Sequence, residues 1–131
     1  MPKVKRFSVI REPVHGDVYL TSEELMLLDT REMQRLRGVK QLGAAWLVYP
    51  GALHTRVEHS IGTVHVASRM IESINRSFEL DPAATSAIRP EEARLIRIAA
   101  LLHDVTHLPY GHSIEDQEGI FERHDSAHRY A

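Results

Sequence analysis

Residues of types that can bind divalent metals lie at the end of an apolar segment of this sequence. The segment begins near Ala93, is interrupted only by Arg94 and Arg97, and ends at His103 and Asp104. A helix that is apolar on nearly every face is normally buried, and a buried carboxylate is costly unless a cation pairs with it. Histidine beside carboxylate is also the ligand chemistry of divalent transition metals. The sequence therefore predicts a metal site built into a helical core.

A third ligand of the same kind lies on the preceding helix, which apolar spacing predicts from about Val57 to Phe78. At about 100° per residue, His59 falls roughly a quarter-turn from the centre of the apolar stripe, whereas His65 falls almost opposite it. We therefore expect His59 at the edge of the core and His65 in solvent. The alternative is a core histidine that is hydrogen-bonded to a buried aspartate, but the number of histidines nearby favours a metal.

A second group of polar residues follows the helix end and contains His107, His112, Glu115 and Asp116. His112 and Glu115 are three residues apart and share a face if this stretch is helical. A histidine oriented by a carboxylate is the usual arrangement of a general acid or base. Spacing alone favours the simpler interpretation, which is a solvated loop after a helix break.

Arginine near a metal suits a phosphate group, because its planar fork bonds two oxygens at once. Arg56 precedes His59 by three residues and is the best candidate for this role. For Arg31 and Arg35 we favour an exposed basic helix face. The sequence has no phosphate loop, dinucleotide-binding glycine motif or serine nucleophile elbow.

Composition limits the class of protein. With 131 residues the chain is long enough for one domain with a real core, and with no cysteine any metal must be held by nitrogen and oxygen. Nine histidines are many for this length, and five of them fall between His103 and His128. A formal net charge of -2 argues against extended nucleic-acid binding. No segment has the length or composition of a membrane span or a signal peptide, so we expect a cytoplasmic protein.

The remaining pattern predicts a mainly α-helical fold with a small β-rich N-terminal segment. The expected elements are, in order, an extended segment with a turn at 3–20, two short helices across 22–41, a loop at 44–55, the helix at 57–78, a linker at 79–90, the central helix opening at Pro90, and a short helix at 113–123.

Three blocks of this sequence, residues 29–43, 49–60 and 103–112, resemble the HD superfamily of metal-dependent phosphohydrolases, and more specifically its deoxynucleoside triphosphate triphosphohydrolase branch. They read DTREMQRLRGVKQLG, YPGALHTRVEHS and HDVTHLPYGH. A His-Asp pair by itself is a weak signal, but three blocks in this order are specific. The resemblance covers most of residues 9–126 and implies an HD-domain helical core.

The resemblance also implies roles for individual residues. It assigns metal ligation to His59, His103 and Asp104, and phosphate contacts to Arg56 and His107. It assigns catalysis to His112, with Glu115 in place of the usual orienting aspartate. A further active-site position falls on His124, and deoxyribose contacts fall on Gln41 and Leu42. In the animal relatives, Asp29 and Arg37 match a nucleotide-activator site.

By this likeness the protein is a divalent-metal-dependent phosphohydrolase that converts deoxynucleoside triphosphates to deoxynucleoside and triphosphate. Two alternatives stay open, an HD phosphohydrolase acting on another nucleotide or phosphodiester, and a non-catalytic helical interaction module with a vestigial site. Nitrogen and oxygen ligands suit iron, manganese, zinc, nickel or cobalt without selecting one. The expected partners are a nucleotide substrate and, in the full-length protein, further copies of the chain, with no membrane.

The family completes its metal site with an aspartate far downstream, and Asp116 and Asp125 come too early to match it. We therefore expect residues 1–131 to be the N-terminal part of a single HD domain. Within it, 3–20 form an extended or hairpin segment and 22–131 form a helical core that stops before the last ligand helix. This part by itself is expected to bind metal weakly and to be inactive.

Overall fold

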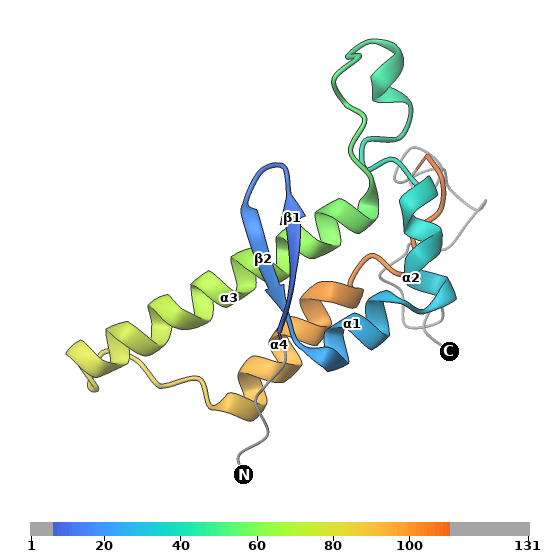
Figure 1. Ribbon diagram of the computed structural model, residues 1–131. Coiled ribbons are helices and arrows are strands. Elements are labelled where there is room, and N and C mark those ends of the chain that lie inside the picture. The colour runs from blue at the N-terminus through green and yellow to red at the C-terminus, as the bar shows by residue number, and fades with distance from the viewer. Residues whose placement is uncertain (1–6, 111–131) are drawn as a thin grey trace, which may run out of the picture.

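Residues 7–110 are described by the structure, a computed structural model (Figure 1). The chain first forms an antiparallel hairpin of β1 (Ser8–Glu12) and β2 (Gly16–Leu20), in which Ser8 pairs with Leu20. The Glu12 carboxylate closes the turn, because its Oε2 accepts hydrogen bonds from the backbone N–H groups of Val14 (3.0 Å) and His15 (2.7 Å). This hairpin is the β-rich N-terminal segment that the sequence predicts.

Two short helices follow, α1 (Ser22–Leu28) and α2 (Arg31–Arg35). Thr21 caps α1 reciprocally with Glu24, as its side chain accepts from the Glu24 N–H while the Glu24 carboxylate accepts from the Thr21 N–H. A 3-10 turn, η1 (Leu36–Gly38), continues α2, and a second one, η2 (Gly43–Leu47), lies in the loop that leads to the next helix. Two short helices in this region agree with the prediction.

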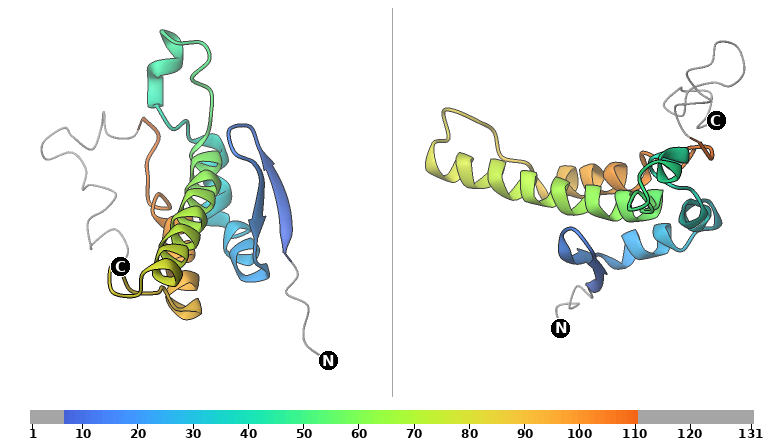
Figure 2. Two further views of the ribbon diagram at one scale, coloured as in Figure 1. Left: turned by 90° about the vertical axis from the view of Figure 1, so that its left-hand side faces the viewer. Right: turned by 90° about the horizontal axis from the view of Figure 1, so that it is seen from above.

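The two longest helices are α3 (Arg56–Leu80) and α4 (Pro90–Leu102), which pack against each other. Thr55 caps α3 in the same reciprocal way with Glu58, and proline stands in the first turn of α4, where its missing N–H leaves no bond unmade. The core lies between these helices, the hairpin, α1 and α2 (Figure 2). Its buried members are Val18, Leu20, Leu28, Met33, Leu36, Val57, Ile61, Val64 and Leu101. The fold is therefore mainly helical with a small sheet, as expected.

The prediction that His65 faces solvent is wrong. The hairpin and α4 lie on different sides of α3 (Figure 2), so the face of α3 opposite the apolar stripe is covered as well. The His65 ring is half-buried and its centroid lies 5.0 Å from that of His15 in the hairpin turn. A Cβ atom at Gly62 would lie 3.1 Å from the same His15 ring. Glycine here thus lets the hairpin approach α3 closely.

The expectation of a fully buried central helix is also wrong for the described part. In α4 only Leu101 is buried, whereas Leu95 is 60% and Ile96 is 40% exposed. One side of this apolar helix packs on the core and the other faces outward. None of the helices within residues 7–110 combines the length and the apolar composition that a membrane span requires.

Candidate metal centre

Three candidate ligands meet where the end of α4 passes the first turns of α3. His59 comes from α3, and His103 and Asp104 directly follow α4. One ligand atom from each residue lies within 4.8 Å of the others. The His59 and His103 Nε2 atoms are 3.1 Å apart, and the Asp104 oxygens lie 3.7 Å from His59 Nε2 and 3.4 Å from His103 Nε2. The fold therefore brings together residues that are 44 positions apart in the sequence.

The tautomer of His103 is set by a hydrogen bond to the Ala100 carbonyl oxygen. Its Nδ1 lies 2.8 Å from the carbonyl oxygen of Ala100, which can only accept a hydrogen bond, so Nδ1 carries the proton. In the neutral ring Nε2 then has a lone pair, and it is directed at His59 and Asp104. A histidine whose other nitrogen donates to a carbonyl is the usual orientation of a metal ligand. Two imidazole nitrogens and a carboxylate that converge in this way fit a divalent transition metal.

The Asp104 carboxylate also forms a buried ion pair. Arg56 Nη1 donates to Asp104 Oδ2 at 2.7 Å, and the two side chains are only 4% and 5% exposed. Arg56 Nη2 donates to the Gln41 carbonyl oxygen at 3.3 Å. Arg56 thus supplies a cation for the buried carboxylate, and burial by itself does not require a metal. The stronger indication of a metal is the convergence of two histidines on the same carboxylate.

The electrostatics of the centre favour the charge states that a metal needs. Burial raises the pKa of Asp104, but the nearby His103 and the bound guanidinium of Arg56 together lower it by a larger amount. The pKa of Asp104 therefore lies below its ordinary value of 3.8. Burial lowers the pKa of His59 below 6.5, and the nearby Asp104 opposes this only in part. At neutral pH the centre therefore presents an ionised carboxylate and a neutral imidazole from His59, which are the forms that bind metals.

The other predicted site residues lie at different depths. His107 is fully buried beside Asp104, and its backbone N–H donates to the Asp104 carbonyl oxygen at 3.0 Å. The Gln41 side-chain oxygen is buried, whereas the neighbouring Leu42 is 54% exposed. His112, Glu115 and His124 lie outside the described residues.

Arg35 has a structural role that the sequence did not indicate. Arg35 is exposed, as expected, and its Nη2 also donates to the carbonyl oxygen of Val105 at 2.9 Å. This bond ties α2 to the turn that carries His103 and Asp104. It joins residues 70 positions apart, and no local pattern of charge or spacing could have shown it.

The part of the chain that contains these three residues is similar to known proteins. The HD domain family model matches residues 56–130, which include His59, His103 and Asp104. An uncharacterized protein of Methanocaldococcus jannaschii is 45% identical over 107 residues, covering 82% of this chain and 20% of that protein. Deoxynucleoside triphosphate triphosphohydrolase SAMHD1 of Danio rerio is 38% identical over 107 residues, covering 82% of this chain and 16% of its own length.

Among solved structures, that of a hypothetical protein from Aquifex aeolicus superposes with a TM-score of 0.70 at 38% identity, covering 84% of this chain and 26% of that one. The chain thus spans about a fifth of the length of the curated relatives named above.

Proposed function

Because the chain belongs to the HD domain family, we propose that it carries the metal centre of a divalent-metal-dependent phosphohydrolase. The observation that carries the proposal is the convergence of the His59 and His103 Nε2 atoms on the Asp104 carboxylate, within 4.8 Å. A divalent ion held by these three residues would stabilise negative charge that develops on a phosphoryl group. Iron, manganese, zinc, nickel and cobalt all suit these ligands.

In this proposal Arg56 acts first on Asp104. Its bond at 2.7 Å keeps the carboxylate ionised and fixes its orientation toward the two histidines. The same guanidinium is buried and already bonded to Asp104. Arg56 can therefore contact a substrate phosphate only if the guanidinium becomes accessible. His107 lies beside Asp104 and is also buried, and the same condition applies to its proposed phosphate contact.

The proposed substrate is a deoxynucleoside triphosphate, and the products are deoxynucleoside and triphosphate. Support comes from relatives named deoxynucleoside triphosphate triphosphohydrolase, of which those of Danio rerio and Bos taurus are 38% and 36% identical to this chain. In this reaction water attacks the α-phosphorus and the bond from that phosphorus to the 5′ oxygen of the nucleoside breaks. His112, oriented by Glu115, gives a proton to the departing 5′ oxygen, and the proton of the attacking water is released to solvent. Gln41 and Leu42 would contact the deoxyribose, and His124 would complete the substrate site.

Metal titration tests the centre directly. We expect Co²⁺ or Mn²⁺ to bind residues 1–131 weakly, with about one ion per chain at saturation, and His59→Ala to weaken this binding by about a further tenfold. The matched control is His54→Ala, since His54 is exposed, precedes α3, and is not among the three converging residues. Equal binding by His59→Ala and the wild type would contradict the ligand assignment.

A nucleotide panel measured on the full-length protein tests the substrate separately, because residues 1–131 by themselves are expected to be inactive. Release of triphosphate from deoxynucleoside triphosphates, with little product from ribonucleotides or phosphodiesters, supports the proposed reaction. Metal binding at the three residues together with turnover of another nucleotide would keep the metal centre but reject this substrate.

A further inference from the structure

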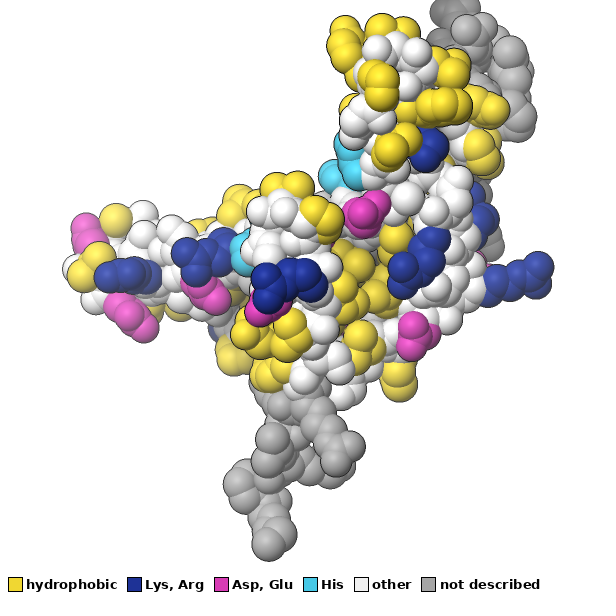
Figure 3. All heavy atoms as spheres, turned by 45° about the horizontal axis from the view of Figure 1, so that its top comes forward, with side chains coloured by type: hydrophobic (Ala, Val, Ile, Leu, Met, Phe, Trp, Pro, Cys, Tyr) yellow, Lys and Arg dark blue, Asp and Glu magenta, His cyan; other side chains and the backbone are white. Residues whose placement is uncertain are grey.

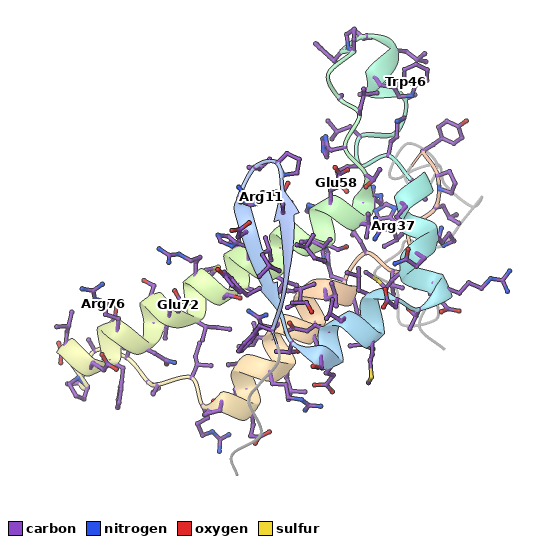
Figure 4. The ribbon with its side chains drawn as sticks, in the orientation of Figure 1. Arg11, Arg37, Trp46, Glu58, Glu72 and Arg76 are labelled. Carbon is purple, nitrogen blue, oxygen red and sulfur yellow. The ribbon has the colours of Figure 1, made fainter. Side chains whose placement is uncertain are left out.

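The loop between η1 and α3 begins beside the metal centre. It extends beyond the N-terminal end of α3 (Figure 1), its outward surface is largely apolar (Figure 3), and the labelled Trp46 lies on it (Figure 4). At the base of this loop are Gln41 and Leu42, for which deoxyribose contacts are proposed above. We call residues 41–43 the sugar segment, and residues 103–110, which carry two of the three candidate ligands, the metal turn.

The sugar segment and the metal turn touch through their backbones at Gly43. A Cβ atom at this position would lie 3.2 Å from the carbonyl oxygen of Tyr110 and 3.4 Å from its Cα and its carbonyl carbon. A side chain at residue 43 would therefore meet backbone, which cannot turn aside as the end of a flexible side chain can. Glycine at this position lets the two segments approach this closely.

Both residues at the contact have a left-handed backbone. The φ angle is 56° at Gly43 and 69° at Tyr110. Among residues 7–110, Tyr110 is the only residue other than glycine with a positive φ. A bulky residue rarely adopts this conformation. Strain of this kind persists only where surrounding contacts enforce it, and it is concentrated at functional sites.

The sugar segment is restrained by hydrogen bonds within its own part of the chain. The Gln41 N–H donates to the His54 carbonyl oxygen at 3.0 Å, and the Gly43 N–H donates to the Lys40 carbonyl oxygen at 3.3 Å. An antiparallel bridge joins Lys40 to Thr55, directly before α3. The base of the loop therefore cannot easily move away from Tyr110.

The metal turn is restrained as well. The Val105 carbonyl oxygen accepts from Arg35 at 2.9 Å, and the Asp104 carbonyl oxygen accepts from the His107 N–H at 3.0 Å. These bonds hold the turn from α2 and from within. It therefore also resists displacement.

A second link joins the same two segments through a side chain. Arg56 Nη1 donates to Asp104 in the metal turn at 2.7 Å, and its Nη2 donates to the Gln41 carbonyl oxygen in the sugar segment at 3.3 Å. The sugar segment is thus tied to the metal turn on one side of Leu42 by Arg56, and on the other side it touches Tyr110 at Gly43. Two contacts define the distance between these segments better than one.

We propose that Gly43 is a positioning residue that sets the distance between the sugar segment and the metal turn. The inference rests on the proposed function, because the two segments then hold the sugar and the phosphate of one substrate. A Cβ atom at residue 43 displaces backbone on one side of the contact by a few tenths of an ångström. Either displacement moves the bound sugar relative to the metal, and a misplaced substrate reacts more slowly.

The test compares variants of the full-length protein in steady-state turnover of deoxynucleoside triphosphates. Gly43→Ala should lower kcat about tenfold or more, while KM changes less than about threefold, because the substrate still binds but is poorly aligned. Its metal content and circular dichroism should match the wild type. The matched control is Gly51→Ala, the same change in the same loop, where a Cβ atom meets nothing within 4 Å. Its kcat should equal that of the wild type.

Gly43→Asn separates the contact from the backbone conformation of residue 43. Asparagine tolerates the left-handed region better than alanine does, but it also has a Cβ atom. We therefore expect it to be as slow as Gly43→Ala.

Wild-type kcat in Gly43→Ala would overturn the inference and leave the proposed function intact. Recovery of kcat in Gly43→Asn would overturn it too, since the turn conformation alone would then explain the glycine. Loss of metal or of helical content in Gly43→Ala would have the same consequence, because a purely structural role would suffice. A wild-type protein that turns over no nucleotide would reject the proposed function and this inference with it.

Discussion

Replacing Asp104 with alanine leaves the guanidinium of Arg56 buried without its carboxylate. In the native chain the two groups are 2.7 Å apart, and 4% of the Arg56 side chain and 5% of the Asp104 side chain are exposed. Water therefore cannot replace the lost partner without opening the structure. The guanidinium also donates to the Gln41 carbonyl oxygen at 3.3 Å, but this neutral acceptor does not neutralise the charge.

The loss of stability caused by Asp104→Ala can be calculated from the burial of this ion pair. Removing one member of a buried ion pair typically costs about 3–5 kcal/mol, whereas a whole domain is stable by about 5–15 kcal/mol. Asp104→Ala should therefore lose about a fifth or more of the free energy of unfolding, besides any loss of metal binding. Arg56→Met with Asp104→Leu removes both charges and should return to within about 2 kcal/mol of the wild type.

Urea unfolding followed by circular dichroism measures these free energies in metal-free buffer. The wild type, the single variants Arg56→Met and Asp104→Leu, and the double variant together form a double-mutant cycle. Asp104→Asn is the matched variant that separates structure from ligation. Its amide oxygen can still accept a bond from Arg56, so it should unfold closer to the wild type than Asp104→Ala does. It has lost the negative charge, and its metal affinity should fall.

A cost below about 1 kcal/mol for Asp104→Ala would refute the reasoning, because it would mean that Arg56 is solvated in the folded chain. A double variant whose cost equals the sum of the two single-variant costs would refute it as well, since no coupling between the two residues would then exist.

Three further predictions concern the residues around the centre. Arg35→Ala releases the Val105 carbonyl oxygen and should lower metal affinity about tenfold in a cobalt titration, with helical content retained. Gly62→Ala would place a Cβ 3.1 Å from the His15 ring and should destabilise the chain by about 1 kcal/mol or more in urea, despite the better helix propensity of alanine. Burial raises the pKa of Glu24, but bonds from Arg97 and Thr21 lower it below 4.5. The ionised Glu24 carboxylate therefore stabilises the fold above pH 4.5, and this contribution is lost as the pH falls through the lowered pKa. Glu24→Gln should therefore be less stable than the wild type near neutral pH, with a difference that shrinks as urea titrations are repeated at lower pH.

Local patterns in the sequence determined the helices and the identity of the candidate ligands. Caps at Thr21 and Thr55 and the proline at position 90 mark where α1, α3 and α4 begin, because capping involves residues within one turn. The histidine count and the His-Asp pair after an apolar helix indicate a metal site. Helical spacing adds His59 as its third ligand, and the resemblance to HD proteins assigns the same three residues.

Tertiary structure decided which surfaces of those helices are covered and which charges pair. His65 was expected in solvent because helical periodicity describes one stripe of α3, while the hairpin that covers the other face is attached far away in the chain. The sequence does not show that Arg56 binds Asp104, 48 residues away, or that the exposed Arg35 binds the Val105 carbonyl oxygen, 70 residues away. Spacing along a helix predicts only the direction in which each side chain leaves that helix. The partners of a side chain depend on how separate elements pack, and that depends on the shape of the whole core.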